Sequence, residues 1–194
     1  MEEEKGNGVL DISRDFVLHW VNEYNKNYAM KPKDADEEKK IKEWLDQQCQ
    51  PKFLDWDHFV RLGRWKTKRQ TSAYKSNDAT LVEEATRLAC EASNEQLRLH
   101  ILTVLNGVSV AVAATILHFM YPNKYPIFDI RARVTLKKAG LWDRDENDAS
   151  EKAWLDYVEI MRSLAHRLDV SLRDLDKALY AYDKRDKKLQ EKSC

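Results

Sequence analysis

Glycine and proline are scarce in this sequence of 194 residues, with five and four copies respectively. Both residues interrupt helices, whereas charged side chains, which make up 34 % of the chain, suit the solvent-facing sides of helices. Hydrophobic residues make up 43 %, including six Trp and eight Tyr, which is enough for a core and argues against global disorder. The composition and length favour one mainly helical domain, or one domain built from two lobes.

Cysteine is also rare, with three widely spaced copies at Cys49, Cys90 and Cys194. This odd number and spacing exclude a disulfide framework and a zinc or iron–sulfur motif, and they favour a reducing compartment. The longest apolar run, Val108–Met120, is too short to cross a bilayer and is interrupted by polar residues. Residues 1–8 are polar and acidic, unlike a signal peptide, and we expect them to form a flexible tail. The sequence therefore predicts a soluble intracellular protein.

An excess of charge of one sign is missing as well, since 33 basic residues balance 33 acidic ones. This balance excludes a globally basic nucleic-acid binder but leaves room for a local basic patch. Residues 61–75 contain six basic residues, no acidic residue, and the aromatic residues Trp65 and Tyr74. Such a segment is typical of a surface that contacts phosphates. The alternative interpretation is an ordinary solvated loop.

Apolar residues recur at helical spacing along most of the chain, and no segment alternates with the period of a strand. We predict nine or ten helices, an all-α fold, with a polar connection at residues 31–36 and a loop at 66–77. Asp129, Ser150 and Ser171 stand where helix-capping residues are expected. The predicted helices cover residues 11–28, 37–48, 57–65, 78–92, 94–105, 110–120, 129–138, 150–167 and 171–188.

The most informative segment is 102–136, LTVLNGVSVAVAATILHFMYPNKYPIFDIRARVTL. Two of its predicted helices are joined by a few residues, and Gly107 stands where the chain must turn sharply. The second helix begins directly after that turn with free backbone N–H groups. A tight glycine turn that leads into a helix N-terminus favours anion binding, and backbone groups contact phosphate rather than base sequence.

The same segment resembles the helix-hairpin-helix element of the DNA glycosylase (HhH-GPD) superfamily. Leu102 and Leu105 match the apolar positions before the turn, and Gly107-Val108 match its first two positions. Ala113 matches the packing alanine, and Ile116-Leu117 matches the apolar pair. The sequence departs from the pattern at Ser109, which replaces the second glycine.

The resemblance continues beyond the hairpin. In these glycosylases a proline-containing loop follows, and an aspartate opens the next helix. Pro122, Pro126 and Asp129 match in order and spacing, which places Asp129 at the position of the family's essential carboxylate. Members that also cleave the DNA strand carry a Schiff-base lysine where this chain has Ala111. The resemblance therefore implies a monofunctional enzyme, and the cysteines of the iron–sulfur members are absent.

A carboxylate at Asp129 suits this chemistry physically. Cleavage of an N-glycosidic bond builds positive charge on the sugar, which a carboxylate stabilises while it orients or deprotonates a water molecule. The N-terminus of a helix favours the charged form of that carboxylate. The simpler alternative is that Asp129 only caps its helix, a role worth about 1 kcal/mol.

The resemblance implies a two-lobed fold with one lobe at about 52–122, which holds the hairpin at 105–111, and a second lobe formed by 9–50 and 123–190. The expected partner is double-stranded DNA, bound by a monomer without an organic cofactor. Because the family's hairpin often holds a monovalent cation through carbonyls, the expectation extends to a cation near Leu105 and Val108. The expected DNA-contacting residues are Lys66, Thr67, Lys68, Arg69, Gly107, Val108, Ser109, Val110, Ala111 and Arg131, and the base-pocket candidates are Trp65, Tyr74 and Tyr125.

Two other functions remain open at this point. The first is a non-catalytic DNA-binding or adaptor protein with the same scaffold, a reading that the zero net charge and Ser109 favour. The second is a helical interaction protein without any DNA partner. Salt-sensitive duplex binding separates the second from both DNA-binding functions.

Overall fold

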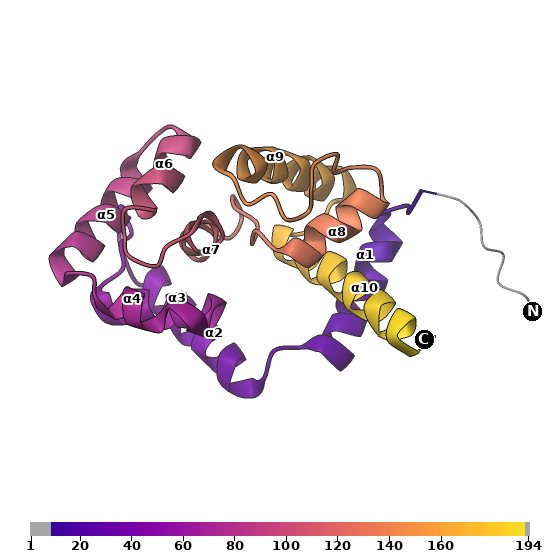
Figure 1. Cartoon of the computed structure of the whole chain (residues 1–194), viewed down its shortest axis with the longest axis horizontal. Helices are drawn as coiled ribbons and strands as arrows, with labels where there is room; N and C mark the ends of the chain where they lie inside the picture. The colour runs from indigo at the N-terminus through magenta and orange to yellow at the C-terminus, as the bar shows by residue number, and fades with distance from the viewer. Residues whose placement is uncertain (1–8, 193–194) are drawn as a thin grey trace, which may run out of the picture.

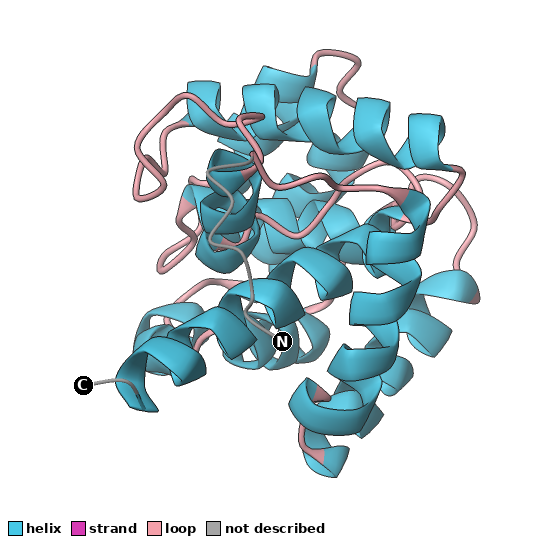
Figure 2. Ribbon diagram, turned by 90° about the vertical axis from the view of Figure 1, so that its right-hand side faces the viewer, coloured by secondary structure: helices cyan, strands magenta, loops and turns pink. Residues whose placement is uncertain are grey.

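The computed structural model describes residues 9–192, so the tail predicted at 1–8 lies outside the described residues. Within them the chain forms ten α-helices and no strand (Figures 1 and 2), which confirms the all-α prediction. The helices are α1 (Arg14–Glu23), α2 (Pro32–Asp46), α3 (Trp56–Lys66), α4 (Thr71–Lys75), α5 (Ala79–Glu91), α6 (Glu95–Leu102), α7 (Val110–Met120), α8 (Ile130–Lys138), α9 (Glu151–Leu168) and α10 (Leu172–Lys192). No helix in this part of the chain is long and apolar enough to cross a membrane.

Helix starts follow from local chemistry that the sequence displays. Short polar side chains before the first turn accept hydrogen bonds from backbone N–H groups that the helix itself leaves unpaired. The predicted caps behave this way: Ser150 Oγ accepts from the Ala153 N–H at 3.1 Å, and Ser171 Oγ accepts from the Asp174 N–H at 3.0 Å. Helix α7 has the predicted bounds, and the 121–128 loop that follows it contains two prolines, which do not continue a helix.

Two local predictions were wrong. Helix α2 begins at Pro32 rather than residue 37, because proline is well tolerated at the first helical position, where no intrahelical acceptor is needed. The predicted loop at 66–77 contains a 3₁₀ turn, Lys68–Gln70, followed by the short helix α4. The side chain of Tyr74 anchors that helix, since it is fully buried against the edge of the Phe59 ring.

The helices form two groups, with α7 between them (Figure 1). On one side lie α3, α4, α5 and α6, and on the other lie α1, α8 and α10, which pack on one another. Helix α2 packs against α3 and α7, so it lies with the first group. The resemblance instead implied that residues 9–50, which include α2, belong to the second lobe.

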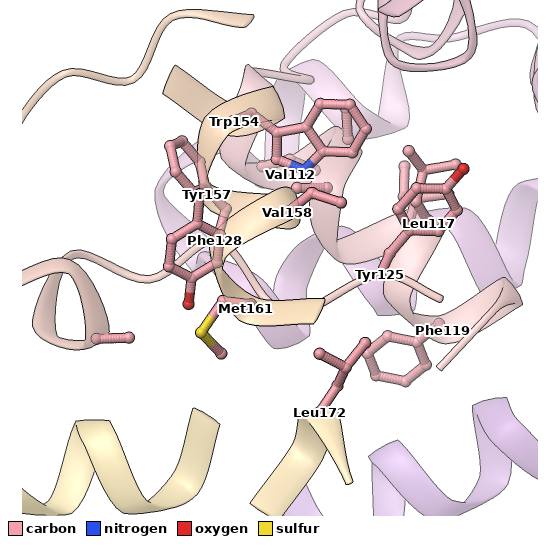
Figure 3. Close-up of a cluster of buried hydrophobic side chains, with 14 of the residues drawn as sticks. Val112, Leu117, Phe119, Tyr125, Phe128, Trp154, Tyr157, Val158, Met161 and Leu172 are labelled. Carbon is pink, nitrogen blue, oxygen red and sulfur yellow. The ribbon is translucent and has the colours of Figure 1, made fainter. Parts of the chain in front are cut away.

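The core continues between the groups, where α9 packs on α6 and α7. Figure 3 shows Trp154 and Val158 of α9 close to Val112 of α7, with Phe128 beside Tyr157. These side chains are at most 2 % exposed. The shared core holds the two groups together and leaves the candidate site at their junction.

Candidate functional site

A cavity of about 360 Å³ lies where α3, the start of α8 and α10 meet the segment that follows α1. Its volume falls within the range of about 300–1,000 Å³ typical of small-molecule sites. The wall combines aromatic rings, acidic groups and two cations. Its residues are Tyr24, Tyr28, Ala29, Met30, Asp34, Trp65, Lys66, Ile127, Asp129, Arg173, Asp176 and Tyr180.

Asp129 lies on this wall and caps α8. One carboxylate oxygen, Oδ1, accepts a hydrogen bond from the Arg131 N–H at 2.9 Å, which fixes the side chain at the helix N-terminus. The other oxygen, Oδ2, lies 3.9 Å from Lys66 Nζ. The side chain keeps 27 % of its surface exposed. The cap therefore uses one oxygen of Asp129 and leaves the second available to a molecule in the cavity.

Lys66 lies beside Asp129 rather than on an outer loop. It is the last residue of α3, and its Nζ donates to the Phe128 carbonyl at 3.4 Å. Its side chain is only 17 % exposed. The sequence predicted a DNA-facing contact for Lys66, but the helix ends with this side chain turned into the cavity. Thr67 follows, and its hydroxyl accepts from the Arg69 N–H at 3.4 Å to begin the 3₁₀ turn.

Sequence reasoning missed the buried carboxylate of the cavity, Asp176, and its partner Arg173. Asp176 Oδ2 accepts from Arg173 at 2.7 Å, while its buried Oδ1 has no hydrogen-bond partner. Burial raises the pKa of Asp176 to about 6, against the opposing effect of Arg173. Arg173 also donates to Glu38 Oε2 at 3.3 Å. The available signal was a charged residue on the apolar stripe of a predicted helix, between Leu172 and Leu179.

The aromatic predictions had mixed outcomes. Trp65 lines the cavity as expected, and its indole Nε1 donates to the Asp34 carbonyl at 3.2 Å. Tyr74 is not a pocket residue, because it is fully buried and away from the cavity. Tyr125 is not one either: its ring stacks on Trp154 in the core (Figure 3), and its hydroxyl donates to Glu95 at 3.2 Å. Sequence reasoning missed Tyr24, Tyr28 and Tyr180, which also line the cavity, and the spacing of Tyr24 and Tyr28 is that of core residues of a helix.

The predicted hairpin joins α6 to α7 through a tight turn. Gly107 has φ +83°, a left-handed conformation that favours glycine, and the Val108 N–H donates to the Leu105 carbonyl at 3.1 Å. Ser109 occupies the position before α7 without a side-chain capping bond. The N–H groups of Val110 and Ala111 open that helix and have no intrahelical acceptor. The cation expected near Leu105 and Val108 stays a prediction.

The turn packs directly on the basic segment of the sequence. A Cβ added at Gly107 would come within 3.0 Å of both Ala73 and Tyr74 in α4. Asn77, buried after α4, accepts from the Asn106 N–H at 2.7 Å and donates to the Asn106 carbonyl at 3.0 Å. The sequence reasoning did not single out Asn77. It holds the hairpin against the segment that carries the predicted basic contacts.

Four cations of this segment face solvent without an ion-pair partner among the described residues. They are Arg64, Lys68, Arg69 and Lys75. Arg61 differs, because it pairs with Glu37 at 2.5 Å and with Asp57 at 3.4 Å. The exposed surface of residues 64–75, which we call the basic strip, therefore runs from the cavity edge at Lys66 to the hairpin.

Arg131, for which the sequence predicts a phosphate contact, instead forms an ion pair within the protein. Its guanidinium donates to Asp183 at 2.8 Å, and the Asp183 side chain is completely buried. Residue 131 lies on the face of α8 that packs against α10, so its charge stabilises that interface. Arg133 is also buried, with its guanidinium 4.1 Å from the centre of the Phe128 ring.

Comparisons with known proteins give no further guide. No protein-family model matches this chain, and no curated protein or solved structure is significantly similar to it. Among the side chains that the structure describes, no cluster of three or more His, Cys, Asp or Glu residues could hold a metal ion. The cavity, the hairpin and the basic strip are therefore the features that indicate a function.

Proposed function

We propose that this protein is a DNA glycosylase that removes a damaged or modified base and leaves an abasic site. The observation that carries the proposal is the position of Asp129: it lies on the wall of an aromatic cavity, with Oδ1 held by the α8 backbone and Oδ2 turned toward Lys66. A fixed carboxylate of this kind suits the stabilisation of positive charge on a sugar.

In the proposed reaction the target nucleotide leaves the duplex and its base enters the cavity. Trp65, Tyr24 and Tyr180 offer stacking or edge contacts to a flat ring. Asp129 then orients and deprotonates a water molecule while the N-glycosidic bond breaks. Water supplies the hydroxyl group at C1′, and the base leaves with the electrons of the bond. Because Ala111 stands at the family's lysine position, this step needs no covalent intermediate.

The hairpin and the basic strip supply the proposed DNA contacts. The N–H groups at the start of α7 suit a phosphate oxygen, and Lys68 and Arg69 are exposed cations of the strip that packs on the hairpin through α4. Asn77 joins these two surfaces through its bonds to Asn106. One duplex could thereby contact both surfaces while a single nucleotide enters the cavity.

The test uses a panel of duplexes, each with one alkylated, deaminated, oxidised or mismatched base. Alkali cleaves the strand wherever an abasic site has formed. We expect cleavage with the native protein and none with Asp129→Asn, because asparagine keeps the helix cap but lacks the charge. Asp55→Asn is the matched control, since Asp55 caps the opposite end of α3 from Lys66.

Duplex binding measured on the same panel separates the remaining functions. Binding without base release from any duplex would contradict the glycosylase and favour the non-catalytic DNA-binding protein. The absence of both binding and release would contradict both DNA functions and favour a helical interaction protein.

A further inference from the structure

A second, smaller pocket adjoins the cavity and has no part in the proposed reaction. It has a volume of about 270 Å³ and lies between the first two turns of α2, the second half of α3 and the 3₁₀ turn that follows α3. Its wall shares Asp34 and Trp65 with the cavity. We call it the cationic pocket, and its other lining residues are Lys33, Glu37, Arg61, Arg64 and Lys68.

The cavity and the cationic pocket differ in the charge of their walls. Three carboxylates and two cations line the cavity, whereas four cations and two carboxylates line the cationic pocket, which gives the pocket a formal charge of +2. One of these cations is already neutralised, because Arg61 pairs with Glu37 at 2.5 Å. The other three have no ion-pair partner in the part of the chain that the structure describes. These free cations are Lys33, Arg64 and Lys68.

The wall that the cavity and the cationic pocket share is held in place by contacts within the protein. The indole Nε1 of Trp65 donates to the Asp34 carbonyl at 3.2 Å, which joins α3 to α2. The same ring packs on the Phe119 ring at an angle of 80°, with 5.0 Å between the ring centres. An anion that enters the cationic pocket therefore has to order only the side chains of the free cations, which lowers the entropic cost of binding.

The charge of the cationic pocket fits a phosphomonoester better than a phosphodiester. A phosphomonoester has a charge of about −1.5 to −2 at pH 7 and three oxygens that accept strong hydrogen bonds. A phosphodiester within a strand has a single negative charge. Two ammonium groups and one guanidinium offer enough N–H donors for all three oxygens of a phosphomonoester. An aromatic cavity beside a cationic pocket thus suits the two ends of a nucleotide, the flat base and the terminal phosphate.

We propose that the cationic pocket binds the terminal phosphate of a nucleotide whose base occupies the cavity. The ligand is a nucleoside monophosphate group, either at a phosphorylated end of a DNA strand or as a free nucleotide. The inference rests on the proposed function for the base, which that function places in the cavity. For a DNA substrate, it means that the preferred modified base lies at a phosphorylated strand end, as at a nick or a gap, rather than within a continuous strand.

The test measures the binding of the full chain to short duplexes that differ in one phosphate. Each duplex ends in one unpaired nucleotide, which carries a terminal phosphate, the methyl ester of that phosphate, or a hydroxyl group. One set of duplexes varies the 5′ end and another the 3′ end, with each of the four ordinary bases in turn. Fluorescence anisotropy of a dye at the opposite end reports binding at a fixed salt concentration. In one of the two sets we expect the phosphate to bind about tenfold more tightly than its methyl ester, because the ester has lost one negative charge.

Free nucleotides distinguish the two sources of the phosphate. Deoxynucleoside 5′-monophosphates compete with the phosphorylated duplex, and the corresponding nucleosides serve as controls. Displacement of the duplex by a monophosphate at a similar concentration would identify a free nucleotide as the ligand. Displacement that requires a large excess of monophosphate would identify the strand end.

Substitutions assign the preference to the cationic pocket. Lys33→Gln and Arg64→Gln remove free cations from two different helices, and the double variant should bind the phosphate and its methyl ester almost equally. Both side chains are exposed, so the fold should be kept, which urea unfolding checks. Lys152→Gln is the matched control, because Lys152 is exposed on α9, lines neither the cavity nor the pocket, and should leave the preference intact. Equal binding of phosphate and methyl ester by the native chain, or a preference that survives in the double variant, would overturn the proposal.

The binding experiment also separates this inference from the proposed function, because it requires no base release. A phosphate preference that depends on Lys33 and Arg64, without base release from the lesion panel, would support the cationic pocket and contradict the glycosylase. Base release without any phosphate preference would support the glycosylase and overturn the inference.

Discussion

The amine of Lys66 lies 3.9 Å from Oδ2 of Asp129, although the two residues belong to helices far apart in the sequence. One is the last residue of α3, and the other is the cap of α8. Their meeting places an acid–base pair on the wall of an aromatic cavity. Because Asp129 has both a capping oxygen and a free oxygen, its structural and chemical roles can be tested separately.

The first prediction concerns these two roles of Asp129. Asp129→Ala removes the cap and should lower the free energy of unfolding by about 1 kcal/mol, whereas Asp129→Asn should keep most of it, because asparagine also accepts the bond from the Arg131 N–H. Both variants should lose base release. Urea unfolding measures the stability. Equal destabilisation by Ala and Asn would show that the charge of Asp129, rather than its capping bond, stabilises the fold.

The hairpin turn supports a second prediction, based on a matched pair of glycines. Gly107 and Gly140 both have positive φ, at +83° and +66°, so alanine at either position costs about 1–2 kcal/mol in backbone strain. A Cβ at Gly107 also meets Ala73 and Tyr74 at 3.0 Å, while at Gly140 the nearest atom, in Val9, is 3.5 Å away. Gly107→Ala should therefore destabilise the protein more than Gly140→Ala. Similar unfolding midpoints for the two variants would contradict the close packing of the hairpin on α4.

The third prediction compares two kinds of cation. Lys68 and Arg69 are exposed and unpaired, so changing both to alanine should weaken duplex binding, lower its dependence on salt and leave stability nearly unchanged. Arg131→Ala should instead destabilise the fold, because among the described residues Lys187, at 3.5 Å, is then the only ion-pair partner of the buried Asp183. Removal of one partner of a buried pair costs about 3–5 kcal/mol, and Lys187 should reduce that cost.

Binding titrations at several salt concentrations, combined with urea unfolding, test this comparison. If duplex binding by the Lys68/Arg69 double variant depends on salt as strongly as that of the native protein, the basic strip is not part of the DNA interface. Unchanged stability of Arg131→Ala would contradict its role at the interface of α8 and α10.

Two buried groups predict opposite dependences of stability on pH. Burial lowers the pKa of His118 to about 4, so between pH 6.5 and 4 the unfolded chain binds a proton that the folded protein does not, and stability falls with acidification. Burial raises the pKa of Asp176 to about 6, so between pH 3.8 and 6 the unfolded carboxyl ionises first, and stability falls as pH rises. The two contributions partly cancel in the native protein.

Single variants should reveal each contribution. Relative to that of the native chain, the free energy of unfolding of His118→Gln should rise by up to roughly 3 kcal/mol as pH falls from 7 to 4. The free energy of unfolding of Asp176→Asn, relative to that of the native chain, should change in the opposite direction. It should be most favourable to the variant at pH 7. Urea unfolding at both pH values provides the measurement. Differences that do not vary with pH would contradict the pKa values assigned to these two groups.

Much of the fold could be predicted because helix boundaries depend on neighbours in the sequence. Asp129, Ser150 and Ser171 cap the helices that they were expected to cap, and α7 has its predicted bounds. The interest in Asp129 as a site residue came from the resemblance of segment 102–136, and the structure places it on the cavity wall. The segment 66–77 was wrongly predicted as a loop, because its helix α4 depends on the burial of Tyr74 between other elements.

The rest of the site depends on how helices face one another. Whether Arg131 contacts phosphate or Asp183 is decided by the packing of α8 on α10, which no local pattern reveals. Lys66 appeared in a basic run, yet its side chain turns inward at the end of α3. Asp176 lies among the apolar positions of its helix, and its charge at such a position was the one feature of the sequence that indicated a site.

The most direct test of the account measures free base rather than strand breakage. The native protein, Asp129→Asn and Asp55→Asn are each incubated in excess over the lesion duplexes, and the released base is identified by chromatography and mass spectrometry. This readout does not depend on alkali. We expect release of one class of modified base by the native protein and by Asp55→Asn, and none by Asp129→Asn. Equal release by Asp129→Asn, or no release from any duplex, would contradict it.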